Sequence, residues 1–297
     1  MKGRKFTLYA ATVANVAIAV TKFIAAGVTG SASMFSEALH SLVDTGDGLL
    51  VLLGLRLARR PPSVRHPYGH GLEVYFWSMV VAMCIFAMGG VVSIYQGVTR
   101  MITPQPIDSP LWGYIVLACA FVFEGISWLI SMKSFGRVRG RRTLWTAIEQ
   151  SKDPTTFVIV LEDSAALIGI LVAAASLTLT KIFHDPRFDA GGSLVIGGLL
   201  VTSGIVLGRE TWSLMIGESA SPKLVAEIRR IAQQRHELGD VQLPRTLHLG
   251  PDQVHVDLDV TPAPETSVKD LGDAVKWIEA AVHAQHPEVS RVSIRLV

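Results

Sequence analysis

The sequence predicts an α-helical membrane protein in which six transmembrane helices are followed by a small cytoplasmic α+β domain. Hydrophobic residues make up 49% of the 297 residues and charged residues 18%, and the mean hydropathy is +0.40. This composition favours a multi-span membrane protein over two soluble domains. Six apolar segments are long enough to cross ~30 Å of hydrocarbon, and the pattern changes after Arg209.

The six expected spans cover residues 6–28, 34–57, 74–98, 111–132, 155–180 and 191–207. The first span contains Asn15 and Lys22 and shows no small-residue cleavage site after a short apolar core, so we expect no removable signal peptide. We expect Lys22 either to snorkel or to pair with a carboxylate. Cys84 and Cys119 both lie in expected spans, which favours a core role over a disulfide.

Loop charges predict the orientation of the spans. The side shared by the N-terminus and the loops after the second and fourth spans carries thirteen Lys and Arg residues, against three on the opposite side. The positive-inside rule then places both termini in the cytoplasm of a multi-pass protein, and we expect the bilayer to be a bacterial inner membrane. The net charge of +2 mostly reflects this topology and predicts no nucleic-acid partner. The thirteen are Lys2, Arg4, Lys5, Arg56, Arg59, Arg60, Arg65, Lys133, Arg137, Arg139, Arg141, Arg142 and Lys152, and the three are Arg100, Lys181 and Arg187.

The last part of the chain has the pattern of a compact α+β domain. We expect helices at residues 222–234 and 267–284 and strands at residues 241–249, 253–260 and 289–296. In the middle strand, apolar residues from Val254 to Val260 alternate with polar ones, which is the period of a half-buried strand. This order of elements is typical of a ferredoxin-like fold. The chain therefore divides into residues 1–208 and 209–297, and the second part is too small for a catalytic unit.

Four ionisable residues form a stripe within the second expected span. Glu37, His40, Asp44 and Asp47 are separated by 3, 4 and 3 positions, which places them on one face of a helix. A charged group in the hydrocarbon core costs on the order of 3 kcal/mol or more, so such residues face a water-filled path or a partner. The stripe is therefore the first candidate for a functional site.

Further carboxylates interrupt other spans and suggest a metal environment. Glu124 lies in the fourth span, and Glu162 and Asp163 lie in the fifth. An imidazole with several carboxylates suits Zn²⁺, Mn²⁺, Fe²⁺, Co²⁺ and Ni²⁺, whereas Cu(I) prefers sulfur. His40 and Asp44, four positions apart, can reach one ion together. A proton or Na⁺ relay without metal and a structural polar network between helices are the alternatives.

Two motifs resemble the cation diffusion facilitator family of divalent-metal transporters. They are the run Ser31-Ala-Ser-Met-Phe-Ser-Glu-Ala-Leu-His-Ser-Leu-Val-Asp44 and the loop His66-Pro-Tyr-Gly-His-Gly71. The resemblance covers the whole chain. It implies six spans, cytoplasmic termini and a ferredoxin-like C-terminal domain that forms a homodimer, so that residues 1–208 would be the transport domain and residues 209–297 the dimerisation domain.

The resemblance also implies a tetrahedral metal site between the second and fifth spans. Carried over to this sequence, the family's ligand positions are His40, Asp44, Ile159 and Asp163. Because Ile159 cannot bind metal, the fourth ligand must be Glu162, a water, Glu37 or Glu124. Leu161-Glu-Asp-Ser-Ala-Ala-Leu, with Glu124-Gly125 and Tyr75-Phe-Trp77, resembles a zinc-transporter branch with His on the second span and Glu-Asp on the fifth. This favours Glu162, with Glu37, Asp47 and Glu124 as possible pathway residues.

This sequence lacks some of the ligands that the resemblance implies for two further metal sites. His66 and His70 are possible ligands of a second, weak site, but Ser63 stands where the family has an Asp, and a simple turn is the alternative. In the C-terminal domain the matching positions read Gln242, Asp257 and Arg295. A different site made by His248, His255 and Asp257 is one alternative, and dimerisation without metal is the simpler one.

The expected function is proton-coupled efflux of a divalent metal, zinc first, by alternating access. Metal binding needs neutral imidazole and ionised carboxylates, so protons compete for the same lone pairs. We expect no prosthetic group and no enzyme activity, since an intramembrane metalloenzyme would need a motif such as His-Glu-x-x-His, which the chain lacks. Transport of Mn, Fe, Co or Ni and a membrane-tethered metal sensor are the alternatives.

Overall fold

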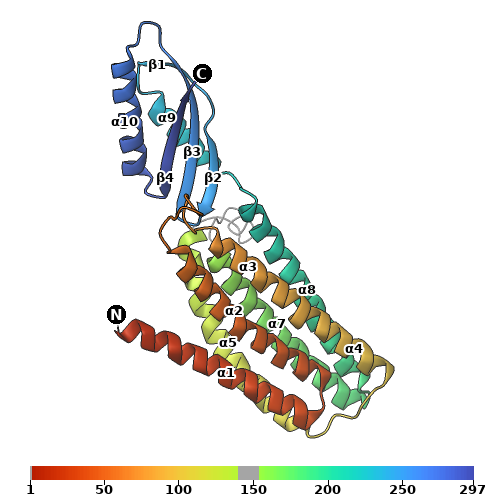
Figure 1. Cartoon of the computed structure of the whole chain (residues 1–297). Coiled ribbons are helices and arrows are strands. Elements are labelled where there is room, and N and C mark those ends of the chain that lie inside the picture. The colour runs from red at the N-terminus through yellow and green to blue at the C-terminus, as the bar shows by residue number, and fades with distance from the viewer. Residues whose placement is uncertain (1, 140–153) are drawn as a thin grey trace. The chain divides into compact units, whose positions relative to one another are not determined.

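The computed structural model describes residues 2–139 and 154–297 (Figure 1). Contacts divide the chain into two compact units. The helical unit comprises Met1–Leu53 and Trp77–Glu210, and the C-terminal unit comprises Gly54–Phe76 and Thr211–Val297. Three of the counted loop charges, Arg141, Arg142 and Lys152, lie outside the described residues.

Each expected span corresponds to one long helical segment. The segments are α1 (Lys2–Thr29), α2 (Ala32–Ala58), the continuous run α3 (Glu73–Cys84), η1 (Ile85–Val91) and α4 (Val92–Ile102), then α5 (Pro110–Arg139), α7 (Pro154–Phe183) and α8 (Arg187–Met215). Five of these are long and apolar enough to cross a membrane, and α1 contributes the shorter apolar stretch Asn15–Thr29 within the described side chains. The prediction of a multi-span helical protein is confirmed.

The last span is longer than predicted. The helix α8 continues to Met215 instead of ending at residue 207, because its sequence contains no proline and the chain stays apolar or helix-favouring beyond that point. Gly217 follows with φ of +105°, a conformation that favours glycine and ends the helix.

Glycines allow α8 to approach the third span closely. A Cβ added at Gly90 in η1 would lie 2.9 Å from the backbone nitrogen of Val201, and one at Gly204 would lie 2.9 Å from the backbone nitrogen of Phe86. Small residues at such crossings let helix backbones pack together within a membrane. This packing brings η1 and α8 against one side of the α2–α7 pair.

The C-terminal unit contains α9 (Pro222–Ala232), β1 (Leu238–Val241), β2 (Arg245–Gly250), β3 (Gln253–Pro262), α10 (Val268–Gln285) and β4 (Val289–Leu296). The central strand β3 pairs antiparallel with β2 and β1 and parallel with β4. The predicted alternation of β3 is confirmed, because its apolar residues are buried together with Ile228 of α9 and Ile278 of α10.

One predicted strand of this unit was wrong. The segment 241–249 is not continuous: β1 ends at Val241 and β2 begins at Arg245. Pro244 lies between them, and proline has no backbone N–H for a strand ladder. The observed order of elements is therefore α-β-β-β-α-β.

Candidate functional site

The ionisable stripe of α2 lies in a helix whose first turn is held by α8. The carboxylate of Asp189, near the start of α8, accepts hydrogen bonds from Ser31 Oγ at 2.7 Å, from the backbone nitrogen of Ala32, and from Ser33 Oγ. A carboxylate at this position satisfies backbone donors that a helix N-terminus leaves free. The seam continues through Ser36 and Ser193, whose hydroxyls are 2.7 Å apart. The beginning of α2 is thus fixed in register against α8.

All four residues of the stripe are largely buried. Glu37, His40 and Asp47 are 0%, 2% and 1% exposed, and the Asp44 side chain is 20% exposed. His40 Nε2 lies 3.2 Å from Asp44 Oδ2. Within the described residues, the other imidazole nitrogen, His40 Nδ1, is buried without a hydrogen-bond partner. The four-residue spacing predicted to let both side chains act together is therefore realised.

A small cavity lies beside this pair. Its volume is about 10 Å³, which is room for roughly one water-sized species. His40, Asp44 and Glu162 line it together with Ser203. The rest of its wall is apolar and comes from η1, α7 and α8, namely Ile85, Val158, Leu161, Ala165, Leu200 and Leu207. Glu162 Oε1 is buried and has no hydrogen-bond partner among the described residues.

The adjacent carboxylates of α7 have different surroundings. Asp163 accepts hydrogen bonds from Ser127 Oγ at 3.2 Å and from Ser131 Oγ at 2.6 Å, both on α5, and does not line the cavity. Neighbouring residues on a helix are rotated by ~100°, so Glu162 and Asp163 cannot face the same helix equally. The structure thus brings Glu162, rather than Asp163, to His40 and Asp44. Ile159 is 47% exposed.

A buried lysine engages two of the predicted pathway residues. Lys22 Nζ of α1 lies 3.1 Å from Glu37 Oε2, 2.6 Å from Ser41 Oγ and 3.8 Å from Glu124 Oε1. The predicted pairing of Lys22 with a carboxylate is confirmed. Lys22 therefore supplies one internal positive charge that Glu37 and Glu124 share in this structure. Asp47 Oδ2 is buried and, within the part of the chain described, accepts no hydrogen bond.

The possible metal ligands of α2 and α7 lie near one another but do not converge on one position. Over residues 2–139 and 154–297, no three His, Cys, Asp or Glu side chains converge as a ready metal-ligand set. His40 contacts Asp44 directly, Asp163 accepts hydrogen bonds from the serines of α5, and Glu162 lines the cavity with no hydrogen bond to any of these three in the described structure. The chemistry of the donor set, one nitrogen and several carboxylate oxygens with unpartnered buried atoms, fits a divalent cation as ligand.

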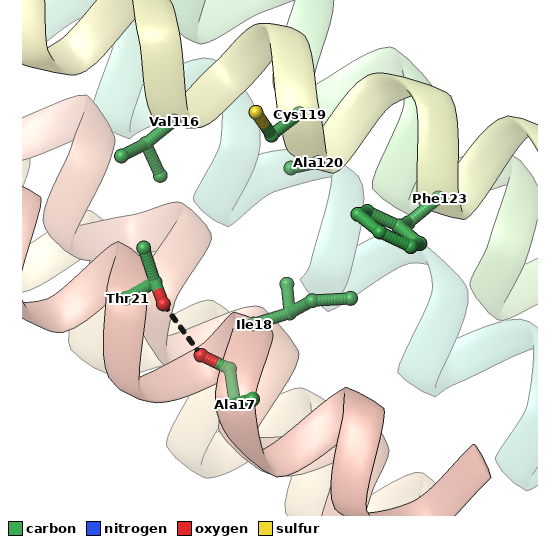
Figure 2. Close-up of a pocket in the computed structure, with 7 residues that line it drawn as sticks. All are labelled: Ala17, Ile18, Thr21, Val116, Cys119, Ala120 and Phe123. Carbon is green, nitrogen blue, oxygen red and sulfur yellow. Dashed lines mark hydrogen bonds between the residues drawn. The ribbon is translucent and has the colours of Figure 1, made fainter. Parts of the chain in front are cut away.

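A larger hollow between α1 and α5 does not belong to this site. It measures about 260 Å³ and is lined almost wholly by apolar side chains, as Figure 2 shows. The one hydroxyl there, Thr21 Oγ1, donates a hydrogen bond to the Ala17 carbonyl oxygen. Since its lining contains no carboxylate and no imidazole, we exclude it as the cation site.

The loop histidines lie within the C-terminal unit. The rings of His66 and His70 have centroids 4.5 Å apart, so the loop brings these two predicted ligands together. Between them in sequence, Tyr68 packs edge-on against His255 of β3, with centroids 5.9 Å apart. The sequence did not predict that this loop would pack on the C-terminal sheet, because no periodicity within a short loop indicates its partner.

The alternative site in the C-terminal domain is wrong. His255 Nε2 lies 3.1 Å from Asp257 Oδ1 on one face of β3. His248 pairs in register with Val254, whose side chain is buried on the other face. Directly opposite residues of an antiparallel pair share a face, so His248 lies on the face away from His255 and Asp257.

Comparisons with known proteins agree over most of the chain. A family model described as the cation efflux transmembrane domain matches residues 8–216. Mouse and human proteins named proton-coupled zinc antiporter SLC30A9, mitochondrial, are each 36% identical over 242 residues, which is 80% of this chain and 42% of theirs. Metal tolerance protein C4 of Arabidopsis thaliana is 30% identical over 216 residues, 72% of this chain and 47% of its own length. The cation-efflux pump FieF of Cronobacter sakazakii is 26% identical over 202 residues, 68% of this chain and 62% of its own.

Proposed function

Because this chain belongs to the cation diffusion facilitator family of metal transporters, we propose that it exports a divalent cation, zinc first, by proton-coupled antiport. The chain spans less than half the length of the mouse, human and Arabidopsis relatives. The observation that supports the proposal in this chain is the cavity lined by His40, Asp44 and Glu162.

The proposed transport site consists of His40, Asp44, Glu162 and Asp163. One imidazole nitrogen and carboxylate oxygens suit tetrahedral zinc. In the described structure, Asp44 is occupied by His40 and Asp163 by Ser131, so an arriving cation would replace both contacts. Loss of these internal contacts offsets part of the free energy of metal ligation. The site can therefore bind the cation and also release it.

Protons couple to metal through the same atoms. Metal ligation needs a neutral His40 and ionised Asp44, Glu162 and Asp163, and a proton at any of these positions occupies a lone pair that the cation requires. In an alternating-access cycle, metal would be taken up from the side of the termini, and protons arriving from the opposite side would displace it. Carboxylate-rich coordination also suits Mn²⁺, Fe²⁺, Co²⁺ and Ni²⁺, and these remain alternative substrates.

The proposed assembly is a homodimer in a lipid bilayer, with residues 209–297 as its dimerisation domain and residues 1–208 as the transport domain. Both termini are proposed to lie on the side from which metal is taken. The comparisons do not support the expectation of a bacterial inner membrane, because the mouse and human relatives are named as mitochondrial. His66 and His70 are proposed as a second, weak metal site. The alternative of a metal sensor acting through the C-terminal domain loses support, since His248 and His255 lie on opposite faces of the sheet.

Metal flux in proteoliposomes tests the proposed function. Vesicles containing the full chain and an acidic lumen should accumulate Zn²⁺, and accumulation should stop when an ionophore dissipates the pH gradient. Asp44→Ala should abolish uptake, whereas Asp252→Ala, an exposed aspartate of the C-terminal unit, should leave it unchanged. A panel with Mn²⁺, Fe²⁺, Co²⁺ and Ni²⁺ ranks the substrates. The proposal fails if none of these ions moves in response to the gradient.

A further inference from the structure

Lys22 is a fully buried cation in the middle of Asn15–Thr29, the apolar stretch of α1. Its side chain is 0% exposed, and α1 is one of the six helices assigned to the membrane. A lysine at such a position costs roughly 2.5–3.5 kcal/mol on insertion scales, so it is expected to have a function and a partner. Its partners come from two other helices, Glu37 and Ser41 on α2 and Glu124 on α5.

These contacts place the ammonium beside the proposed transport site. Ser41 directly follows His40, and Glu37 precedes His40 by three positions, or about one turn. Residues three apart on a helix have Cβ atoms only ~5–6 Å from each other. Lys22 therefore contacts two α2 side chains, Glu37 and Ser41, that are neighbours of His40 on the helix.

Without this ammonium, the carboxylates would be ready cation ligands. Glu37 is fully buried, and a Cβ added at Gly169 of α7 would lie only 2.0 Å from Glu37 Oε1, so the carboxylate is confined against the α7 backbone. Within the described structure, that same oxygen has no hydrogen-bond partner. Glu37 can thus turn neither to solvent nor to another donor, and Lys22 is the cation that neutralises it.

We propose that Lys22 limits the affinity for the transported cation, because it occupies Glu37 and Glu124 and so keeps these carboxylates from ligating the metal. The metal then binds only at the donor set around the cavity, from which protons can displace it. The inference rests on the proposed function and adds to it. Lys22 acts as a resident counter-charge that limits affinity, and it does not touch the metal.

In a double-mutant cycle, changes of opposite sign in Zn²⁺ affinity for the two single variants distinguish this role from simple packing. Lys22→Gln frees the carboxylates and should raise Zn²⁺ affinity at least ~10-fold or add a second bound ion, because loss of a positive charge beside the site removes a repulsion of the divalent ion. Glu37→Gln removes the nearer of the two carboxylates that face Lys22, leaves more of its positive charge uncompensated beside the site and should lower affinity. In the double variant the two changes should offset, giving an affinity near wild type. A structural role would make both single variants change in the same direction.

Calorimetric Zn²⁺ titration of the purified full-length protein, with flux measured in parallel, tests the proposal. Lys181→Gln, at an exposed lysine near the end of α7, is the matched control and should behave as wild type. Tighter binding in Lys22→Gln should accompany slower flux, since the ion is released less easily. If Lys22→Gln does not fold, Glu37→Gln and the double variant decide: recovery of affinity in the double variant supports the proposal, and continued weak binding overturns it.

Two failures are distinguishable. A wild-type protein that neither binds nor transports any divalent ion removes the proposed function itself. A wild-type protein that transports Zn²⁺, with single variants that are unchanged or shifted in one direction, overturns the role of Lys22 alone.

Discussion

At the scale of single residues, a cation site is indicated by several buried polar atoms that lack hydrogen-bond partners in the described structure. His40 contacts Asp44 with one nitrogen, and its other nitrogen, like Glu162 Oε1, is buried with no hydrogen-bond partner among the residues described. Buried polar atoms are nearly always paired in proteins, and an exception calls for an explanation. A cation ligand in the adjacent cavity would supply that missing partner.

Glu162→Gln should lower Zn²⁺ affinity at least ~10-fold, which corresponds to ~1.4 kcal/mol. Glutamine keeps the volume of the side chain but loses the charge that lines the cavity. The measurement is calorimetric titration of the purified full-length variant. Unchanged affinity in Glu162→Gln would leave a water or Glu37 as the better fourth ligand.

Asp163→Ala should abolish transport with the fold intact. Vesicle flux measures the transport, and elution volume checks the fold.

His40→Asp should change both the ion preference and the pH dependence of binding. Aspartate keeps a donor on the same face of α2 but removes the borderline nitrogen, which favours harder, oxygen-seeking ions such as Mn²⁺. An imidazole has an ordinary pKa of ~6.5 and a carboxyl ~3.9, so proton competition should move toward acid. Metal affinity measured against pH for both proteins checks the two effects. Superimposable curves and an unchanged ion ranking would assign His40 a structural role.

At the scale of elements, side-chain pairs tie neighbouring strands together. Asp259 of β3 and Arg295 of β4 are in register, and two guanidinium nitrogens of Arg295 reach the carboxylate, Nη2 at Oδ2 and Nε at 3.0 Å from Oδ1. Arg245 of β2 reaches the same carboxylate at 3.4 Å. The hydrogen bond from Arg295, with further attraction from both arginines, lowers the pKa of Asp259 below its ordinary value. This one carboxylate joins three strands.

Asp259→Asn should destabilise the C-terminal domain in a pH-dependent way. Because the folded-state pKa is lowered, the charged carboxylate stabilises the fold above its ordinary pKa of ~3.9, and this contribution is lost as the pH falls through the folded-state value. The gap in urea midpoint between wild type and variant in the fragment 209–297 should therefore be largest near neutral pH and close in acid. An equal gap at all pH values would show that the ion pair is not its source.

At the scale of the whole molecule, the chain combines a helical unit that holds the candidate site with a C-terminal unit that holds a sheet. The segment Gly54–Phe76, which contains the end of α2, the following loop and the start of α3, belongs to the second unit by its contacts. Packing of Tyr68 against His255 gives this loop a fixed partner on β3.

The fragment 217–297 should dimerise in solution with little dependence on metal. Its strands and helices bury a core of their own, and its only predicted metal alternative is divided between two faces of the sheet. Sedimentation with Zn²⁺ and with a chelator should give the same dimer. Two tight Zn²⁺ sites per protomer by calorimetry would contradict this expectation.

The sequence by itself determined the features that depend on local periodicity and composition. The six helical segments, the stripe from Glu37 to Asp47 and the alternation along β3 follow from spacing that can be read along the chain, and the family follows from the resemblance of two motifs. A helix has 3.6 residues per turn wherever it packs, so the residues that share its face are known before its neighbours are.

Only the tertiary structure decided which groups meet across elements. It placed Glu162 at the cavity and Asp163 against the serines of α5, gave Lys22 two carboxylates as partners, and packed the loop containing Tyr68 on the C-terminal sheet. The rotation of ~100° between adjacent helical residues makes either carboxylate of α7 a candidate until the position of α2 is known. Packing between helices that are distant in sequence fixes that position, and no local pattern records it.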